Sequence, residues 1–218
     1  MKGEEKMENK QNIERFEKLF SKIKREGADN LLKFIQKSDF YAAPASTKHH
    51  LCVEGGLLQH SLNVYDALCA EMKNPYWDKA LEKVSEETIL VVSLLHDLCK
   101  TYYYAESTKN QKTYDQAKVA AAEPRSVKHD NAGDFIWETV PYYTVEDKYP
   151  LGHGSKSVIF IMTRMKLTME EITAITWHMG AYCDRNQWNE LGNAYEKYPL
   201  ALALHHADMI ATYLLDKE

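Results

Sequence analysis

The sequence predicts an all-α fold, a helical bundle with one small irregular or β-rich insertion. Apolar residues recur at helical spacing through most of the chain, and several of these runs begin at residues that cap helices. The segment from 101 to 150 differs, because it is rich in tyrosine and β-branched residues. With 218 residues, of which 44% are hydrophobic and 27% charged, the chain is long enough to bury one substantial core.

The first part of the chain is predicted to form two helices without chemistry of their own. Apolar residues at helical spacing run through 11–25, Gly27 interrupts them, and 28–37 repeats the pattern. A loop with Pro44 follows, over 40–50. We therefore expect an N-terminal helical appendage at 1–43, before a metal-binding domain at 44–218 that carries an insertion at about 101–150.

The next two helices are expected to form the centre of the domain. Gly55-Gly56 permits a sharp turn into a helix over 57–72, which carries His60. Ser85 is a favourable N-cap, and the helix after it is apolar nearly all round. That pattern predicts a central buried helix, which ends by presenting His96 and Asp97.

The segment 101–150 is expected to hold short strands or a hairpin with loops. Tyr102-Tyr103-Tyr104 and the stretch 134–149 are aromatic and β-branched, and Pro141 and Pro150 interrupt them. Its role as a surface insertion or as a substrate cover stays open. Its tyrosines and Trp137 could stack on a base or simply pack.

Three further helical segments complete the expected bundle. Gly152-His153-Gly154-Ser155 opens a helix over 156–165. A capping box at 168–171 starts the next helix, which carries His178 and stops at Gly180. After a polar loop or weak helix at 184–197, Pro199 begins a last helix that reaches about residue 215.

Charge and cysteine content narrow the functional classes. A net charge of −5 argues against a broad nucleic-acid-binding surface. The four cysteines are scattered without a C-x-x-C pair, and the charged start contains no apolar signal-peptide core. The longest apolar run, over 89–95, is too short to span a bilayer. We expect a cytoplasmic protein with reduced thiols and no membrane partner.

Six side chains of metal-ligand type stand on or at the ends of the expected helices: His60, His96, Asp97, His153, His178 and Asp208. A single histidine on a helix is more often structural than a ligand. Asp208 is harder to explain that way, because its apolar neighbours imply burial and an unpaired buried carboxylate is costly. Six nitrogen and carboxylate ligands exceed the four of a structural zinc and suit two metals that share a carboxylate.

Five strings surround these residues: His49-His50-Leu51-Cys52-Val53-Glu54-Gly55-Gly56-Leu57-Leu58-Gln59-His60-Ser61, Leu94-Leu95-His96-Asp97-Leu98-Cys99-Lys100, Gly152-His153-Gly154, Trp177-His178-Met179 and Leu204-His205-His206-Ala207-Asp208. They resemble the HD superfamily of metal-dependent phosphohydrolases, over roughly 44–215. His60, His96-Asp97 and Asp208 match its H…HD…D pattern, and His153 and His178 match its dinuclear branch. The first string is especially similar to the HD part of YhaM-type 3′→5′ exoribonucleases.

The resemblance implies two divalent ions, of Fe, Mn, Ni, Co, Zn or Mg. His60, His96, Asp97 and Asp208 would hold one ion, and His153 and His178 the other, with Asp97 bridging. A hydroxide bound to both ions would attack phosphorus in line.

Three more residues are expected to assist this chemistry. Lys100 is expected to contact a phosphate oxygen, or else to be an ordinary lysine at a helix end. His205 is expected to orient Asp208 or touch substrate, and His50 to reach phosphate.

The expected substrate is a small, nucleotide-like phosphate ester. An extended nucleic acid fits less well, because the charge is acidic and no segment before Pro44 fits the OB-fold domain of the exoribonucleases. The same ligands would also serve a mixed-valent di-iron oxygenase, and a non-catalytic regulatory module is the third hypothesis. The sequence leaves a homodimer possible.

Overall fold

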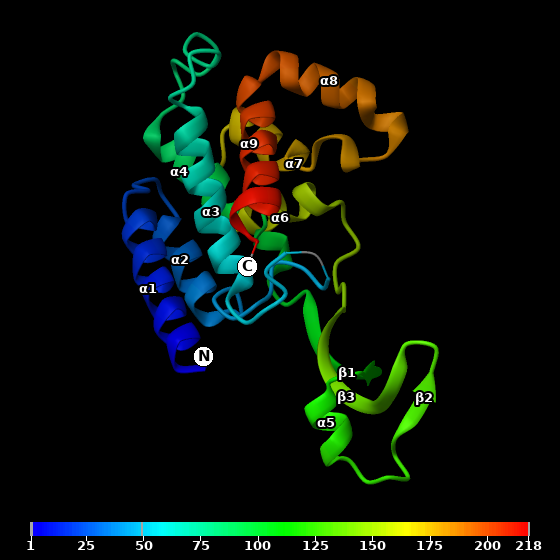
Figure 1. Cartoon of the computed structure of the whole chain (residues 1–218). Coiled ribbons are helices and arrows are strands. Elements are labelled where there is room, and N and C mark those ends of the chain that lie inside the picture. Colours follow the sequence, from blue (N-terminus) through cyan, green and yellow to red (C-terminus); the bar gives the residue numbers. More distant parts are fainter. Residues whose placement is uncertain (1, 49, 218) are drawn as a thin grey trace. The chain divides into compact units, whose positions relative to one another are not determined.

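The structure, a computed structural model, describes residues 2–48 and 50–217. His49, the first histidine of the quoted His49-His50 pair, lies outside the described residues, as do Met1 and Glu218. The chain forms two compact units, Met1–Tyr104 with Glu146–Glu218, and Ala105–Val145 (Figure 1). The fold is mostly helical with a small sheet, as expected. The expected division between residues 43 and 44 stays a prediction.

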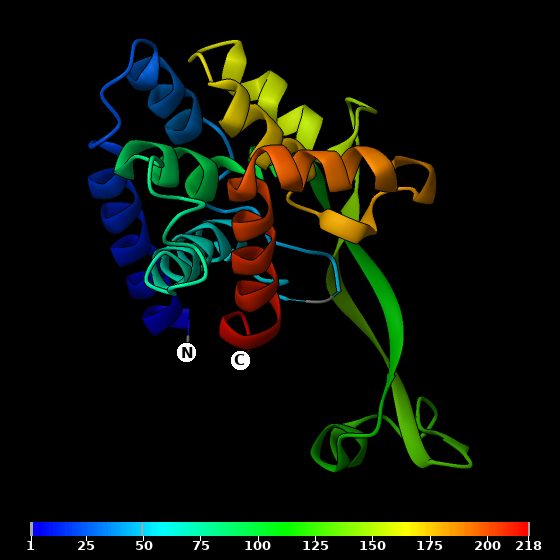
Figure 2. The ribbon, with the colours of Figure 1, turned by 90° about the horizontal axis from the view of Figure 1, so that it is seen from above.

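The larger unit is a bundle built around α3 (Gly56–Glu71) and α9 (Pro199–Ile210). Helix α3 packs against α9 and against α4 (Glu86–Leu95) (Figure 2). Helix α9 also packs against α7 (Met169–Trp177), which in turn contacts α6 (His153–Met162). Their apolar faces meet in one continuous core.

Helix α4 is the central buried helix that the sequence predicts. The Ser85 side chain accepts a hydrogen bond from the backbone N–H of Thr88, which caps the helix. Every residue from Leu90 to Leu95 is buried, so the helix contacts protein on all sides. It therefore ends inside the molecule, and the residues that follow it enter the core.

The first two helices, α1 (Lys2–Phe20) and α2 (Ala28–Lys37), belong to the same core. Phe16 and Leu31 are fully buried in it, and α1 contacts α3 and α4. Between them Gly27 has φ of 91°, and a Cβ there would lie 2.0 Å from the carbonyl oxygen of Arg164. Only glycine fits this close approach of the α1–α2 turn to the end of α6.

The remaining segments of this unit are short or irregular. Residues 188–197, expected as loop or weak helix, form α8 (Trp188–Lys197), which buries Leu191 and Ala194 three residues apart. Three single 3₁₀ turns follow helices or link them: η1 (Leu98–Lys100), η2 (Gly180–Tyr182) and η3 (Arg185–Gln187). Helix α9 continues into a π-helical turn, η4 (Ala211–Leu215).

The smaller unit contains the β-structure expected in the insertion. Strands β1 (Tyr104–Thr113), β2 (Lys128–Asp130) and β3 (Gly133–Val145) form a sheet of order β1–β3–β2. Strand β2 pairs antiparallel with β3, with Lys128 opposite Phe135. A short helix, α5 (Gln116–Ala121), was not expected from the sequence; Asp115 caps it and Val119 anchors it. Trp137 is half exposed on β3.

No helix among the described residues is both long and apolar enough to cross a membrane. The four cysteines are free thiols, as the sequence predicts.

Candidate metal centre

Two helices of the bundle end in a histidine that is held in the same way. His96 follows α4, and its Nδ1 donates to the carbonyl oxygen of Ser93 at 2.8 Å. His178 follows α7, and its Nδ1 donates to the carbonyl oxygen of Ile175 at 2.6 Å. Because a carbonyl only accepts, each Nδ1 carries the proton and each Nε2 can keep its lone pair for another partner. Both rings are fully buried.

Asp97 follows His96, and its two carboxylate oxygens face different side chains. Its Oδ1 lies 2.6 Å from Nε2 of His153 and 3.5 Å from Nε2 of His178. Its Oδ2 lies 2.7 Å from Nζ of Lys100, at the end of η1, and within 3.6 Å of Nε2 of His60. The carboxylate is buried, so these contacts replace its hydration.

The charge of Asp97 is stabilised by its surroundings. Burial raises the pKa of Asp97, but its electrostatic interactions with Lys100, His96 and His153 and the hydrogen bond to His153 outweigh burial and hold this pKa well below its usual range. Burial lowers the pKa of Lys100, and the opposing charge of Asp97 more than restores it. At neutral pH the two form a buried ion pair.

Helices α3 and α9 bring the other expected ligands to the same point. His60, one turn inside α3, has its Nε2 3.2 Å from Oδ1 of Asp208 on α9 and 3.2 Å from Nε2 of His96. Burial lowers the pKa of His60, but hydrogen bonds to Asp208 and Asp216 raise it to about 9. Burial raises the pKa of Asp208, and the hydrogen bond and charge of His60 bring it far below normal. In the metal-free protein a proton on His60 thus offsets the surrounding carboxylates.

The buried histidine and aspartate groups could hold a metal ion. Their ligand atoms fall into several sets within 4.8 Å, among them His60 with His96 and Asp97, and His96 with His178 and Asp208. One observation beyond proximity supports this. Nε2 of His178 is buried and has no hydrogen-bond partner among the residues that the structure describes, although it faces Asp97. An unpaired buried nitrogen is costly, and a cation would satisfy it together with the two carboxylates.

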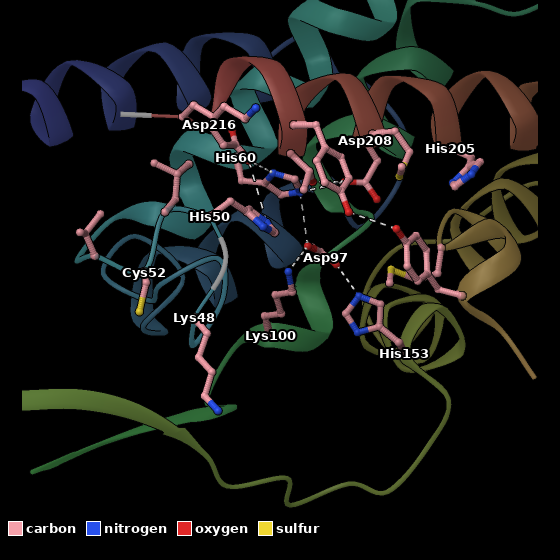
Figure 3. A pocket seen from close by; sticks show the side chains of 18 residues that line it. Lys48, His50, Cys52, His60, Asp97, Lys100, His153, His205, Asp208 and Asp216 are labelled. Carbon is pink, nitrogen blue, oxygen red and sulfur yellow. Dashed lines mark hydrogen bonds and ion pairs between the residues drawn. The ribbon is translucent and has the colours of Figure 1, made fainter. Parts of the chain in front are cut away.

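The three residues expected to assist the chemistry all line one cavity. It has a volume of about 1040 Å³, and Asp97 and Asp208 line it as well (Figure 3). Lys100 and His50 both line it, and the His50 ring lies against the His60 ring, with centroids 5.0 Å apart. Among the described residues, neither buried ring nitrogen of His50 has a hydrogen-bond partner. Burial, followed by the charges of His60 and Lys100, lowers the pKa of His50 to about 4.

His205 serves a different contact from the one expected. Its Nδ1 donates to the backbone carbonyl of His178 at 2.7 Å, so this hydrogen bond supports His178 and not Asp208. The ring lies against Gly180, where a Cβ would come within 2.5 Å of it. His205 also lines the cavity, so a contact with substrate stays a prediction.

Two residues of the centre do not stand out in the sequence. Cys99 has its Sγ 3.3 Å from Nδ1 of His153, and its place inside the His96–Lys100 string was the available signal. Asp216 has its Oδ2 2.7 Å from Nδ1 of His60. Its sequence neighbours do not indicate burial: Asp216 is buried, although the apolar Leu214 and Leu215 before it are exposed.

The cavity combines cationic and apolar walls. Lys48, Lys100 and Lys217 contribute positive charge, whereas Tyr182 and Tyr213 contribute aromatic surface. The two tyrosine hydroxyls lie 3.1 Å apart. A ligand with an anionic and a flat apolar part would match both walls.

Comparisons with known proteins assign no family to this chain: no protein-family model, no curated protein and no solved structure matches it.

Proposed function

We propose that this protein is an HD-type metal-dependent phosphohydrolase or phosphodiesterase that acts on a small, nucleotide-like phosphate ester. The observation that carries the proposal is the position of Asp97. Its two oxygens face different histidines, His153 and His178 on one side and His60 and His96 on the other. A carboxylate so placed suits a bridge between two cations.

The proposed ligand sets are those that the resemblance to the HD superfamily implies. His60, His96 and Asp208 would hold one divalent ion, His153 and His178 the other, and Asp97 both. Imidazole and carboxylate ligands suit Fe, Mn, Co, Ni or Zn, and carboxylate with water also suits Mg. When bound, such a pair supplies an activated water and neutralises the charge of phosphoryl oxygens.

The protein's own side chains would position the ester. Lys100 lies 2.7 Å from Asp97, so its ammonium is close to the point where a phosphoryl group would meet the ions. His50 is neutral at pH 7, because its pKa is about 4. Its ring makes no hydrogen bond within the described part of the chain, so it would offer one N–H donor to a phosphate oxygen. The aromatic wall of the cavity would take the apolar part of the substrate.

The cavity also supports the expected substrate size. Ligand pockets typically enclose about 300–1,000 Å³, and this cavity of about 1040 Å³ is at the upper end of that range. It therefore suits a molecule such as a mononucleotide or dinucleotide. The proposed compartment is the cytoplasm, where cysteines such as these four stay reduced.

The test combines elemental analysis of the purified protein with a panel of nucleotides, phosphomonoesters and phosphodiesters. Wild type should bind a divalent metal and hydrolyse at least one class of ester. Asp97→Ala and Asp97→Asn should lose both properties. Asp66→Asn is the matched control, because Asp66 lies on the exposed side of α3 and pairs with Arg15. Hydrolysis that survives both Asp97 changes would refute the proposal.

The same measurements separate the two rival functions. Tight iron, an electron paramagnetic resonance signal and oxygen consumption without ester hydrolysis would indicate an oxygenase. Protein that is purified without chelator and holds no metal would indicate a regulatory module.

A further inference from the structure

Asp216 is a buried carboxylate whose position the proposed function does not explain. It follows the π-helical turn η4, where its backbone N–H donates to the carbonyl oxygen of Ala211 at 2.8 Å. This wide turn directs the Asp216 side chain into the protein, where it is 0% exposed. A carboxylate out of water is unfavourable unless its oxygens are hydrogen-bonded, so its partners should reveal its role.

Both oxygens of Asp216 are hydrogen-bonded, and one bond is to a proposed metal ligand. Oδ2 accepts from Nδ1 of His60 at 2.7 Å, and Oδ1 accepts from Nδ2 of Asn63 at 2.7 Å. Asp216 thus lies behind the His60 ring, while Nε2 on the other side of the ring faces Asp97 and Asp208 (Figure 3).

Asn63 continues this contact into a chain of amides that reaches the first helix. Its Oδ1 accepts from Nε2 of Gln59 at 2.7 Å, and Oε1 of Gln59 accepts from Nδ2 of Asn12 at 2.6 Å. Asn12 belongs to α1. An ionised carboxylate only accepts, so it fixes the direction of every hydrogen bond in the chain.

We propose that Asp216 is a positioning residue of the candidate metal centre. It keeps the one proton of neutral His60 on Nδ1, so that Nε2 is available to a cation that replaces the second proton. Asn63, Gln59 and Asn12 fix Asp216 in turn, so helix α1 helps to set the geometry of the centre. The cation-binding part rests on the proposed function. The orientation of His60 does not, because it follows from hydrogen bonds within the chain.

The distances favour this arrangement of the proton. A neutral His60 has one N–H, which could donate to Asp216 at 2.7 Å or to Asp208 at 3.2 Å. The shorter contact is the stronger hydrogen bond, so the proton belongs on Nδ1. A carboxylate behind a ligating histidine also makes its other nitrogen more basic, and losing such a partner typically weakens metal affinity by about 10- to 100-fold.

The first readout is the affinity of the full-length protein for Zn²⁺ alone, measured by competition with a chelator. Asp216→Leu removes both acceptor oxygens and should weaken binding by about 10- to 100-fold. Asp216→Asn keeps the shape and should weaken binding in the same direction, which guards against a folding defect in the leucine variant.

Substitutions of the amides that hold Asp216 should weaken Zn²⁺ affinity less, the further the amide is from Asp216. Asn63→Leu removes one hydrogen bond from Asp216 and should cost about 2- to 10-fold in affinity. Asn12→Leu, two amides further away, should cost less than Asn63→Leu. Asp66→Asn on the same helix as Asn63 should leave the affinity unchanged.

The second readout needs no metal. Nitrogen-15 NMR of the metal-free protein at about pH 10, where imidazoles are neutral, should show His60 protonated at Nδ1 in the wild type. In Asp216→Leu the proton should move to Nε2 in a large part of the population. A purely structural role for Asp216 would change stability without changing this tautomer.

The outcomes separate the two proposals. Wild type that binds no Zn²⁺ would count against the proposed function, while the His60 tautomer would still decide the role of Asp216. The positioning role is overturned if both Asp216 variants fold, keep the wild-type Zn²⁺ affinity and leave the His60 proton on Nδ1.

Discussion

Replacing Arg25 by methionine should be among the most destabilising changes outside the metal centre. Arg25 lies between α1 and α2, and its Nη1 and Nη2 bind the two oxygens of Glu171 at 2.7 and 2.8 Å. Glu171 is fully buried in the first turn of α7, where its Oε2 also accepts from the backbone N–H of Thr168 at 2.8 Å. Without Arg25 this carboxylate keeps one partner for two oxygens.

The magnitude follows from the burial of the pair. Arg25 is 18% exposed and Glu171 0%, so water cannot replace the lost guanidinium. Removing one member of a buried ion pair typically costs about 3–5 kcal/mol, whereas replacing both members by apolar residues is often close to neutral. The double variant Arg25→Met with Glu171→Met should therefore be more stable than Arg25→Met alone, although it loses the capping box of α7.

Urea unfolding of the wild type, the two single variants and the double variant measures these free energies. Zn²⁺ affinity of folded Arg25→Met should match the wild type, because Glu171 lies at the opposite end of α7 from His178. A cost below about 1 kcal/mol, as for an exposed pair, would refute the reasoning. So would a double variant less stable than Arg25→Met.

Three further predictions concern the centre itself. Adding a divalent ion at about 100 times its dissociation constant should raise the free energy of unfolding by about 2.7 kcal/mol. A thermal melt detects this change, and an unchanged melting temperature would contradict metal binding. The metal-free protein should lose stability as pH rises from about 6.5 to 9. His60 and His153 are buried, and burial lowers the pKa of each. Asp208 and Asp216 nevertheless raise the pKa of His60 to about 9. Asp97 and Cys99 raise the pKa of His153 to about 9. Because a raised pKa favours the folded state below the unfolded pKa, the free energy of unfolding from urea titrations should fall over this window by at most about 3 kcal/mol per histidine. A free energy of unfolding that stays constant over this window would contradict the prediction. Gly180→Ala should destabilise the fold by about 1–3 kcal/mol, because φ is 55° and the new Cβ would meet His205 at 2.5 Å; equal urea midpoints for the variant and the wild type would refute this.

Local sequence signals predicted most of the helical elements. Ser85 and the capping box at Thr168 marked the starts of α4 and α7 correctly, since a cap depends on neighbours in the chain. The apolar residues on all sides of α4 predicted its burial correctly, because this pattern too can be recognised within one continuous segment. The sequence left α8 open as a loop or a weak helix. The segment is polar, and the helix depends on the packing of Leu191 and Ala194, which the sequence does not show.

The expected ligand residues were predicted from strings in five separate segments. The structure brings the four histidines to Asp97, and Asp208 to one of them, His60. The sequence was enough to select these residues, because each is a histidine or an aspartate within a short recognisable motif. It could not assign partners, because His60 is 156 residues from Asp216 and contacts it only through the packing of α3 on α9.

The sequence by itself predicted which side chains could ligate a metal and which helices begin and end near them. The tertiary structure decided the rest. A π-helical turn buries Asp216 beside two exposed leucines, and His205 donates to the backbone of His178. The sequence could not indicate either contact, because each hydrogen bond joins residues that are far apart in the chain and meet only when the helices pack.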